Sequence, residues 1–406
     1  MKKIQYLPLE GNSMGFYGLL AFLCAFILAG LGATYYMEHN GHWVTGMNNQ
    51  IAWGMPHVFA VFLIVAASGA LNVASIGTVF GKKMYQPLGR LSSLVALALL
   101  AGGLVVLLLD LGRPDRLIVA MTKYNFKSIF AWNIILYTGF FAITGIYIWM
   151  MMDRSMKKFY RPAGIAAFIW RLILTTGTGS IFGFLVARQG YDAAIMAPMF
   201  IIMSFSFGLA FFILVTMATY KWTDRPLGDA ILYRLKNLLG VFVAAVMYFV
   251  LAYHLTNLYA TEHHGVEAFI LTGDSIHTKL FWIGQILLGG IAPLVILYSN
   301  LGKSRTWIAI SSLLVIIGGM AQMYVIIIGG QAYPLQMFPG MEVVSSTFSD
   351  AAAYHAYTPS LPEILLGLGG VAITIFMIVF GCKVLNFLPA SLADEAVDPH
   401  SAATDK

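Results

Sequence analysis

The sequence predicts an all-α integral membrane protein in which ten helices cross the bilayer. Of its 406 residues, 59% are hydrophobic and only 10% are charged, whereas charged residues make up about a quarter of a typical soluble domain. The apolar residues also gather into ten long stretches. A helix needs about 20 mostly apolar residues to cross a bilayer, because lipid offers no hydrogen-bond partner to a free backbone amide. A soluble globular fold is therefore excluded.

The expected helices follow the change from apolar to polar residues along the chain. The first stretch follows Lys2 and Lys3 and ends in Tyr35 and Tyr36 without a small-residue cleavage site, so we expect it to stay as a membrane helix. The ten expected spans are residues 13–36, 52–80, 91–111, 128–152, 162–187, 196–219, 237–260, 278–300, 306–330 and 361–385.

An internal repeat is expected to organise these helices. Gly69 is followed 18 residues later by Pro87-Leu88-Gly89, Gly208 is followed 18 residues later by Pro226-Leu227-Gly228, and the two matches are offset by 139 residues. The second to fifth and the sixth to ninth helices then form two parallel four-helix units, with one extra helix at each end. The expected regions are 1–36 (N-terminal segment and first helix), 37–195 (first unit), 196–330 (second unit), 331–385 (loop and tenth helix) and 386–406 (tail).

Lysine and arginine residues are shared unequally between the two sides of the membrane. The side that holds both termini carries 17 of the 24, the opposite side carries six, and Arg171 lies inside the fifth span. Because cytoplasmic loops retain an excess of these residues, we expect both termini to be cytoplasmic in a multi-pass protein of the bacterial inner membrane. The net charge of +6 is then a topology signal and does not indicate nucleic-acid binding.

Three long connections on the opposite, outer side exceed what a helical bundle needs. They cover residues 37–51, 261–277 and 331–360. We expect them to form a docking surface for a partner outside the cytoplasm, and flexible loops are the alternative interpretation.

Cysteine usage limits the redox chemistry. Cys24 lies midway along the first span and Cys382 at the inner end of the last, and no C-x-x-C-H motif is present. The protein is therefore expected to have no covalent haem and no iron–sulfur cluster of its own. Electron transfer would need a bound organic carrier, a haem held by histidines, or partner subunits.

Ionisable residues in or beside membrane spans are costly and usually functional. Asp110 ends the third span, and the Gly-Arg-Pro turn after it is expected to bring Arg113 back into an ion pair with Asp110. A purely structural role, in which the pair only holds the turn rigid, is an alternative of equal weight.

A second polar group opens the second span. Asn48, Asn49 and Gln50 offer amide groups, Trp53 is typical of the interfacial belt, and His57 is the first titratable residue inside the helix. Because imidazole titrates near neutral pH, His57 can hydrogen-bond a quinone carbonyl and pass on the proton released when quinol is oxidised. A lone histidine at a helix end is more often structural.

Four motifs together resemble one family. They are the run W-G-M-P-H-V-F-A-V-F-L-I-V-A-A-S-G-A from Trp53, the turn L-D-L-G-R-P-D-R from Leu109, F-W-I-G-Q from Phe281 and Y-T-P-S-L-P-E-I from Tyr357. Over spans two to ten the sequence is similar to the NrfD/PsrC family of quinone-interacting membrane subunits. The ten-helix branch, which contains DsrP-like and HybB-like subunits, is the most similar.

The resemblance implies a quinone-reactive subunit of an oxidoreductase complex rather than a complete enzyme. Menaquinone or ubiquinone would bind near the periplasmic face of the first unit, without a metal site. Electrons would pass to or from a periplasmic iron–sulfur subunit in dissimilatory sulfur metabolism, with a multihaem cytochrome c and further membrane and cytoplasmic subunits as other partners. Carried over by position, the quinone-binding residues would be Asn49, Trp53, His57, Asp110 and Arg113, with His57 and Asp110 catalytic and Arg171 and Glu363 on a proton path.

Two other functions stay open at the level of sequence. His57, His254 and His277 fall in the outer third of their spans, and two facing histidines would hold a haem b. Parallel repeats and buried charges also permit a transporter, although the Gly/Pro-broken helices expected at a midplane transport site are lacking.

Overall fold

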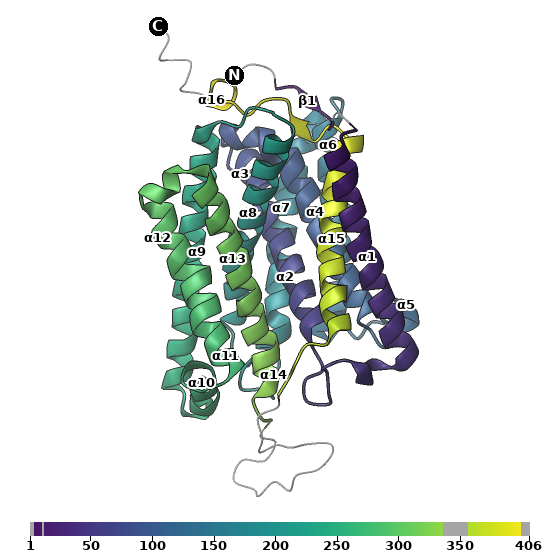
Figure 1. Cartoon of the computed structure of the whole chain (residues 1–406), viewed down its shortest axis with the longest axis vertical. Helices are drawn as coiled ribbons and strands as arrows, with labels where there is room; N and C mark the ends of the chain where they lie inside the picture. Colours follow the sequence, from purple (N-terminus) through teal and green to yellow (C-terminus); the bar gives the residue numbers. More distant parts are fainter. Residues whose placement is uncertain (1–3, 10–11, 336–355, 399–406) are drawn as a thin grey trace, which may run out of the picture.

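The protein is an all-α membrane protein. The computed structural model describes residues 4–9, 12–335 and 356–398, and within them ten helical segments are long and apolar enough to span a bilayer (Figure 1). The first half of the protein consists of β1 (Tyr6–Leu7), α1 (Met14–Asn40), η1 (His42–Val44), α2 (Met55–Ala70), α3 (Asn72–Thr78), η2 (Lys83–Leu88), α4 (Gly89–Leu109), η3 (Pro114–Arg116), α5 (Leu117–Thr122), α6 (Ile129–Met152), η4 (Lys157–Phe159) and α7 (Tyr160–Gly183).

The second half is built in the same way from long helices joined by short helical turns. It contains α8 (Met196–Trp222), α9 (Asp229–Tyr259), η5 (Thr261–His263), α10 (His264–Leu271), α11 (Ile276–Lys279), η6 (Leu280–Ile291), α12 (Ala292–Tyr298), η7 (Asn300–Lys303), α13 (Arg305–Tyr324), η8 (Val325–Gly329), α14 (Gly330–Ala332), α15 (Leu361–Val384), β2 (Leu388–Pro389) and α16 (Asp394–Val397). The segments η6 and η8 are π-helical stretches inside longer spans.

Each of the ten predicted spans corresponds to one helical segment of the structure. The largest difference is α9, which begins at Asp229 although the prediction began at residue 237. Its first turns alternate buried Ile231, Leu232 and Leu235 with more exposed polar residues, so the apolar content is too low for the pattern to be seen. The predicted second span is interrupted after Ala70, where α2 ends and α3 begins.

The two ends of the described chain meet at one end of the bundle. Strands β1 and β2 pair antiparallel, with Tyr6 opposite Pro389 and Leu7 opposite Leu388. Figure 1 shows this paired-strand end at the top, with the connections around α10, α11 and α14 at the opposite end. The predicted outer connection 331–360 lies mostly outside the described residues.

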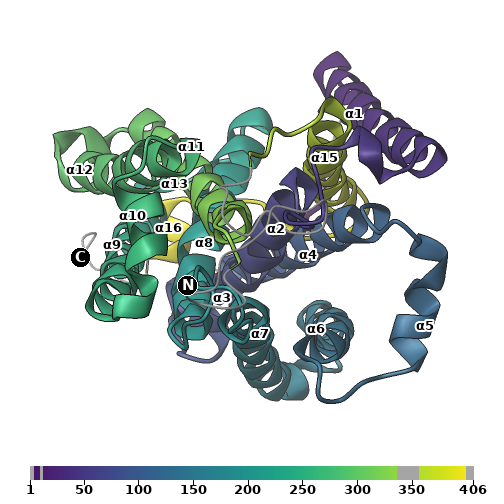
Figure 2. The same cartoon turned by 90° about the horizontal axis from the view of Figure 1, so that it is seen from below.

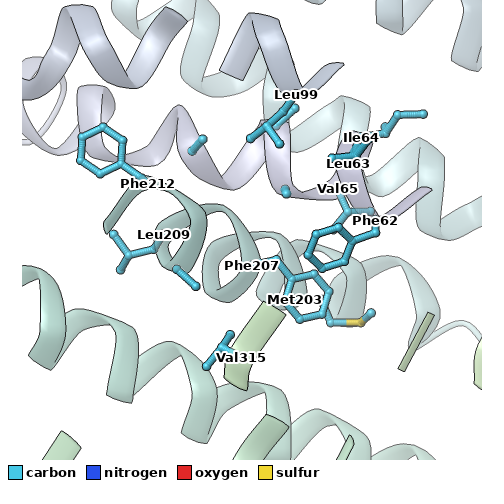
Figure 3. Close-up of a cluster of buried hydrophobic side chains, with 14 of the residues drawn as sticks. Phe62, Leu63, Ile64, Val65, Leu99, Met203, Phe207, Leu209, Phe212 and Val315 are labelled. Atoms are coloured by element: carbon cyan, nitrogen blue, oxygen red, sulfur yellow. The ribbon is translucent and has the colours of Figure 1, made fainter. Parts of the chain in front are cut away.

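Helix α2 is the centre of the bundle, with α4, α8 and α15 packed around it (Figure 2). In the most apolar 18 residues of the span Met55–Thr78, which joins α2 and α3, 89% are buried. Figure 3 shows the cluster where α2 meets α8, in which the rings of Phe62 and Phe207 stack with centroids 5.2 Å apart. Burial of such side chains stabilises a fold by about 1.5–3 kcal/mol each in water, and in lipid close packing takes over that role.

Two glycines allow α2 and α8 to touch backbone to backbone. A Cβ atom on Gly69 would lie 1.6 Å from the carbonyl oxygen of Ser204, and one on Gly208 would lie 2.2 Å from the nitrogen of Ala70. These are the two glycines that the sequence repeat placed at equivalent positions. Their meeting agrees with a pseudo-symmetric pair of units, and the arrangement in two four-helix units stays a prediction.

Candidate functional site

A cavity of about 760 Å³ lies between α2, α4, α6 and α7 at the end of the bundle opposite the paired strands. Figure 2 shows α5 at the rim of this region, outside the helices that form the bundle. The cavity walls are mostly apolar. The lining residues are Trp53, His57, Val61, Ile64, Ala101, Leu104, Val105, Leu107, Leu108, Leu111, Arg113, Arg116, Leu117, Ala120, Met121, Phe130, Asn133, Ile134, Tyr137, Thr138, Phe141, Thr178, Ile181, Phe182 and Ile327.

His57 reaches the cavity because α2 begins just before it. Gly54 is the N-cap and Pro56 lies in the first turn, where a missing N–H costs nothing. A Cβ atom on Gly54 would lie 2.4 Å from Oε1 of Glu363 and 2.7 Å from the Tyr357 hydroxyl, so a larger residue would have to displace these two side chains. His57 is therefore fixed within the first turn, at the mouth of the cavity.

Asp110 lies directly beside His57. Nδ1 of His57 is 2.9 Å from Oδ2 of Asp110, whose side chain is 1% exposed. Within the described residues neither atom makes a hydrogen bond of good geometry, so the two groups are at ion-pair distance without being aligned. His57 lines the cavity and Asp110 does not. Asp110 thus lies beside the imidazole ring, behind the cavity lining.

The predicted ion pair between Asp110 and Arg113 was wrong. Arg113 donates from Nε and Nη2 to the carboxylate of Asp115, over 3.2 and 3.3 Å. The reason is local: a residue before proline avoids the helical region, and Arg113 with ψ of 70° points along the chain instead of folding back. These exposed hydrogen bonds raise the pKa of Arg113 and lower that of Asp115. Arg113 still lines the rim of the cavity.

Trp53 forms the aromatic wall next to His57. Its ring stacks on the imidazole with centroids 6.0 Å apart and meets Phe182 edge-on at 5.8 Å. The residue lies outside α2, so another group must hold its backbone. Gln331 does this: its Oε1 accepts from the amides of Ala52 and Trp53 over 2.9 and 3.0 Å, and its Nε2 donates to the Trp53 carbonyl over 3.0 Å.

Residues further along the chain brace this wall. Arg188 donates to the carbonyls of Gln331 and Gln50 over 3.1 and 3.0 Å. The hydroxyl of Tyr191 donates to the carbonyl of Ile327, and burial raises the pKa of Tyr191, which keeps it a neutral donor. Sequence reasoning missed Gln331 and Tyr191. A signal for Gln331 existed, since it is a polar residue next to the end of a predicted span.

Two further polar residues line the cavity, and sequence reasoning missed Asn133. Asn133 in α6 donates from Nδ2 to the carbonyls of Ile129 and Gly177, and its Oδ1 accepts weakly from Thr178 at 3.5 Å. Both Asn133 and Thr178 line the cavity. They place amide and hydroxyl groups on the wall formed by α6 and α7. Asn49, by contrast, is an exposed loop residue and is not among the lining residues.

Glu363 is fully buried at the start of α15 and binds the segment that precedes α2. Its carboxylate accepts from the amides of Gly46 and Ser360 over 2.8 Å each, and from the Tyr357 hydroxyl over 2.6 Å. Tyr357 in turn accepts from the amide of Met55 over 2.6 Å. Burial, followed by the hydrogen bond to Glu363, raises the pKa of Tyr357. Glu363 thus connects α15 to the beginning of α2 without lining the cavity.

Arg171 is fully buried in α7, away from the cavity lining. Its Nη2 donates to Oδ1 of Asn72 over 2.9 Å, and the guanidinium lies over the rings of Phe168 and Phe205. Within the described residues, Nε and Nη1 have no hydrogen-bond partner. Arg171 is therefore a cation within the membrane whose hydrogen bonding is incomplete.

The histidines considered for a haem do not share the cavity. His57 is the one histidine among its lining residues. His254 is 2.7 Å from Glu267, which also accepts from Asn257, and His277 packs on Phe269. Among the described residues, no three of His, Cys, Asp and Glu group to hold a metal ion.

Comparison with known proteins identifies the family. The family model described as "Polysulphide reductase, NrfD" matches residues 43–334. The chain belongs to the NrfD family. It is 27% identical over 97% of its length, and 99% of the relative's, to the Hdr-like menaquinol oxidoreductase integral membrane subunit of Archaeoglobus fulgidus.

Two further relatives are named as parts of reductases. A putative dimethyl sulfoxide reductase membrane subunit of Halobacterium salinarum is 27% identical over 93% of this chain and 92% of its own length. A protein of Wolinella succinogenes that is named as part of polysulfide reductase is 22% identical over 70% of this chain and 96% of its own length. The Archaeoglobus and Halobacterium relatives of this NrfD-family protein are thus named as membrane subunits of oxidoreductases, and the Archaeoglobus relative is named for menaquinol.

Proposed function

We propose that this NrfD-family protein is the quinone-reactive membrane subunit of an oxidoreductase complex, and that the quinone head group binds in the cavity beside His57. The main support is the cavity itself, which combines apolar walls with one titratable ring backed by a buried carboxylate. Small-molecule sites commonly have this composition, and their volumes run from about 300 to 1,000 Å³. The name of the relative that acts on menaquinol adds independent support.

The residues present fit a quinone. The walls from α4 and α6, such as Leu104, Leu108 and Ile134, are apolar and only partly buried, which suits an isoprenoid tail that continues into lipid. The polar groups gather elsewhere in the cavity: His57 at its mouth, and Asn133 and Thr178 on the facing wall. Both menaquinone and ubiquinone carry two ring oxygens that such groups can hydrogen-bond.

A bound quinone supplies reversible two-electron, two-proton redox chemistry. His57 would hold one ring oxygen, and Trp53 would cover one side of the head group. A carboxylate beside Nδ1 favours the proton on that nitrogen and leaves Nε2 as the acceptor, so Asp110 prepares the ring to take a proton from a hydroxyl in the cavity. The resulting imidazolium would be stabilised by the neighbouring carboxylate.

A binding measurement with a matched control tests this proposal. His57→Leu should weaken binding of a short-tailed menaquinol analogue, and in the assembled complex it should slow quinol oxidation roughly ten- to hundred-fold, which corresponds to about 1.5–3 kcal/mol. His264→Leu serves as control, because its exposed ring does not line the cavity and hydrogen-bonds the carbonyl of Leu258, near the end of α9, over 2.9 Å. Unchanged affinity and rate in His57→Leu would remove the head group from this cavity.

The partners follow from the position of the site. We place the cavity on the periplasmic side of a bacterial inner membrane, because the side with both termini carries 17 of the 24 Lys and Arg residues. An iron–sulfur subunit docked there would exchange electrons with the quinone, and a multihaem cytochrome c and further subunits would complete the complex. The Wolinella relative, named for polysulfide reductase, supports a role in sulfur metabolism and a DsrP-like position. Co-purification of the complex that yields no iron–sulfur subunit would contradict the proposed partner.

Arg171 and Glu363 are proposed to lie on a proton path. Thr178 lines the cavity, Thr175 lies one turn below it and donates to Ser68 over 2.6 Å, and Arg171 follows on the same face of α7. In proteoliposomes that hold the complex, Arg171→Gln should slow the pH change that accompanies quinol oxidation. Electron transfer to an artificial acceptor in detergent should stay normal, and an equal loss of both would assign Arg171 a structural role. Glu363→Gln tests the outer end of the proposed proton path in the same assay.

A further inference from the structure

A second large cavity lies at the paired-strand end of the bundle, far along the molecule from the His57 cavity. Its volume is about 740 Å³, and it lies between the start of α4, the end of α6 and strand β1. The two cavities share no lining residue. The proposed quinone chemistry therefore gives this cavity no role.

The cavity carries an excess of positive charge. Arg90, Arg154 and Lys157 line it, against the single carboxylate of Asp153. That carboxylate already accepts two hydrogen bonds from Ser155, from the backbone amide and the hydroxyl, at 2.8 Å each. A negatively charged group in this cavity would thus meet three cations and one carboxylate that is occupied by its own turn.

Arg90 is the innermost of the three cations. Its Nη2 donates to the carbonyl of Met151 over 2.6 Å and its Nη1 to the carbonyl of Asn386 over 3.1 Å, while its Cζ atom lies 3.9 Å from the centre of the Tyr6 ring. None of these partners is a carboxylate, so the charge of Arg90 is uncompensated by them. The same contacts hold the N-terminal strand and the end of α6 against α4.

A second wall of the cavity is apolar. It is formed by Met150, Met151, Met152 and Ile4, at the point where α6 leaves the membrane. Trp149, the residue before this wall, is 55% exposed, as is typical of a side chain at a lipid interface. A ligand that fits both walls needs an anionic head and an adjoining apolar part. Soluble anions lack the second feature.

We propose that this cavity binds the phosphodiester head group of an anionic glycerophospholipid. The cations of Arg154 and Lys157 would contact the phosphate oxygens, and the side-chain amides of Gln5 and Gln86 offer further donors. Basic cavities between membrane helices on the cytoplasmic side are suited to such head groups. The bound lipid would hold the turn after α6 against the N-terminal strand. The protein would then carry one specifically bound lipid at this site.

Native mass spectrometry of the full-length protein in detergent tests this site. The wild-type protein, incubated with phosphatidylglycerol, should retain one lipid under collisional activation, whereas phosphatidylcholine should dissociate. The double variant Arg154→Gln, Lys157→Gln should bind phosphatidylglycerol roughly thirty-fold more weakly, since each basic residue near the surface raises the affinity by a factor of about five to six. Both side chains are exposed, so the variant should fold.

Lys158→Gln is the matched control. Lys158 is an exposed neighbour in the same turn, but its ammonium lies over the Phe159 ring and does not line the cavity. Equal lipid retention by the double variant and this control would overturn the proposal. Thermal unfolding separates the two sources of phosphate: if inorganic phosphate raises the unfolding temperature as much as phosphatidylglycerol does, and the double variant loses both effects, the site binds a free anion and the lipid is excluded.

Discussion

Asp110 lies 2.9 Å from Nδ1 of His57, but only the histidine reaches the cavity. The two residues come from opposite ends of their helices, since His57 is in the first turn of α2 and Asp110 caps the end of α4. The pair therefore exists only when α2 and α4 are packed side by side. In the proposed function, the carboxylate has a positioning role and contact with the ligand is left to the imidazole.

Asp110→Asn separates these two roles. The variant keeps the shape of the side chain but removes its charge, so we expect kcat for quinol oxidation to fall roughly ten- to hundred-fold. The KM for quinol should change little, because Asp110 does not line the cavity. Steady-state kinetics of the reconstituted complex measure both. A large rise in KM with unchanged kcat would instead indicate that the carboxylate contacts the ligand.

Gln331→Leu should disturb the site without touching His57. The substitution removes the acceptor of two part-buried hydrogen bonds, from the amides of Ala52 and Trp53, and an amide left unpaired costs up to about 1–3 kcal/mol where it is buried. We expect a lower unfolding temperature and weaker quenching of tryptophan fluorescence by a quinone analogue, because Trp53 loses its fixed position.

Gln322→Leu is the control for this prediction. Gln322 is also a buried glutamine of the same span, but its amide nitrogen has no hydrogen-bond partner within the described residues. Removal of the Gln322 amide group should therefore change the unfolding temperature little. If both variants lower the unfolding temperature equally, the hydrogen bonds of Gln331 with the segment before α2 do not contribute measurably to stability.

The sequence was sufficient to predict the ten spans, because a bilayer forces each crossing helix to be long and apolar. It also identified His57 and Asp110 as unusual polar residues. The partner of Asp110 was mispredicted because nearness along the chain favoured Arg113, whereas the actual neighbour comes from another helix. Asn133 and Gln331 were missed for the same reason: each is a single polar residue whose role depends on which helices pack together.

The helix α5 shows another limit of sequence reasoning. Its six residues lie inside a connection between two spans, too short for a periodic pattern to be recognised. The structure places Leu117 and Met121 of this helix on the rim of the cavity. The short glycine repeat, in contrast, identified two residues that are in contact, since Gly69 and Gly208 meet in the core.

Gly208→Ala should unfold or strongly destabilise the protein. The added Cβ atom would lie 2.2 Å from the backbone nitrogen of Ala70, a buried residue at the end of α2 whose backbone is packed against α8 and cannot move aside. Such overpacking costs about 1–3 kcal/mol or more. Gly32→Ala is the control, because a Cβ atom there has no neighbour within 4 Å and alanine favours the helix. Thermal unfolding in detergent should rank Gly208→Ala below the wild type and Gly32→Ala at or above it.

The orientation of the bundle decides on which side the partner of the His57 cavity must dock. A variant with Cys24 and Cys382 changed to serine provides the background for single cysteines at Ser155, in the exposed turn after α6, and at Asp274, whose side chain is 99% exposed between α10 and α11. The excess of Lys and Arg on the paired-strand side predicts that this side is cytoplasmic. A membrane-impermeant maleimide should therefore label Asp274→Cys in intact cells, and Ser155→Cys only after the membrane is permeabilised. The reverse pattern would place the His57 cavity on the cytoplasmic face, and a periplasmic iron–sulfur partner would then be excluded.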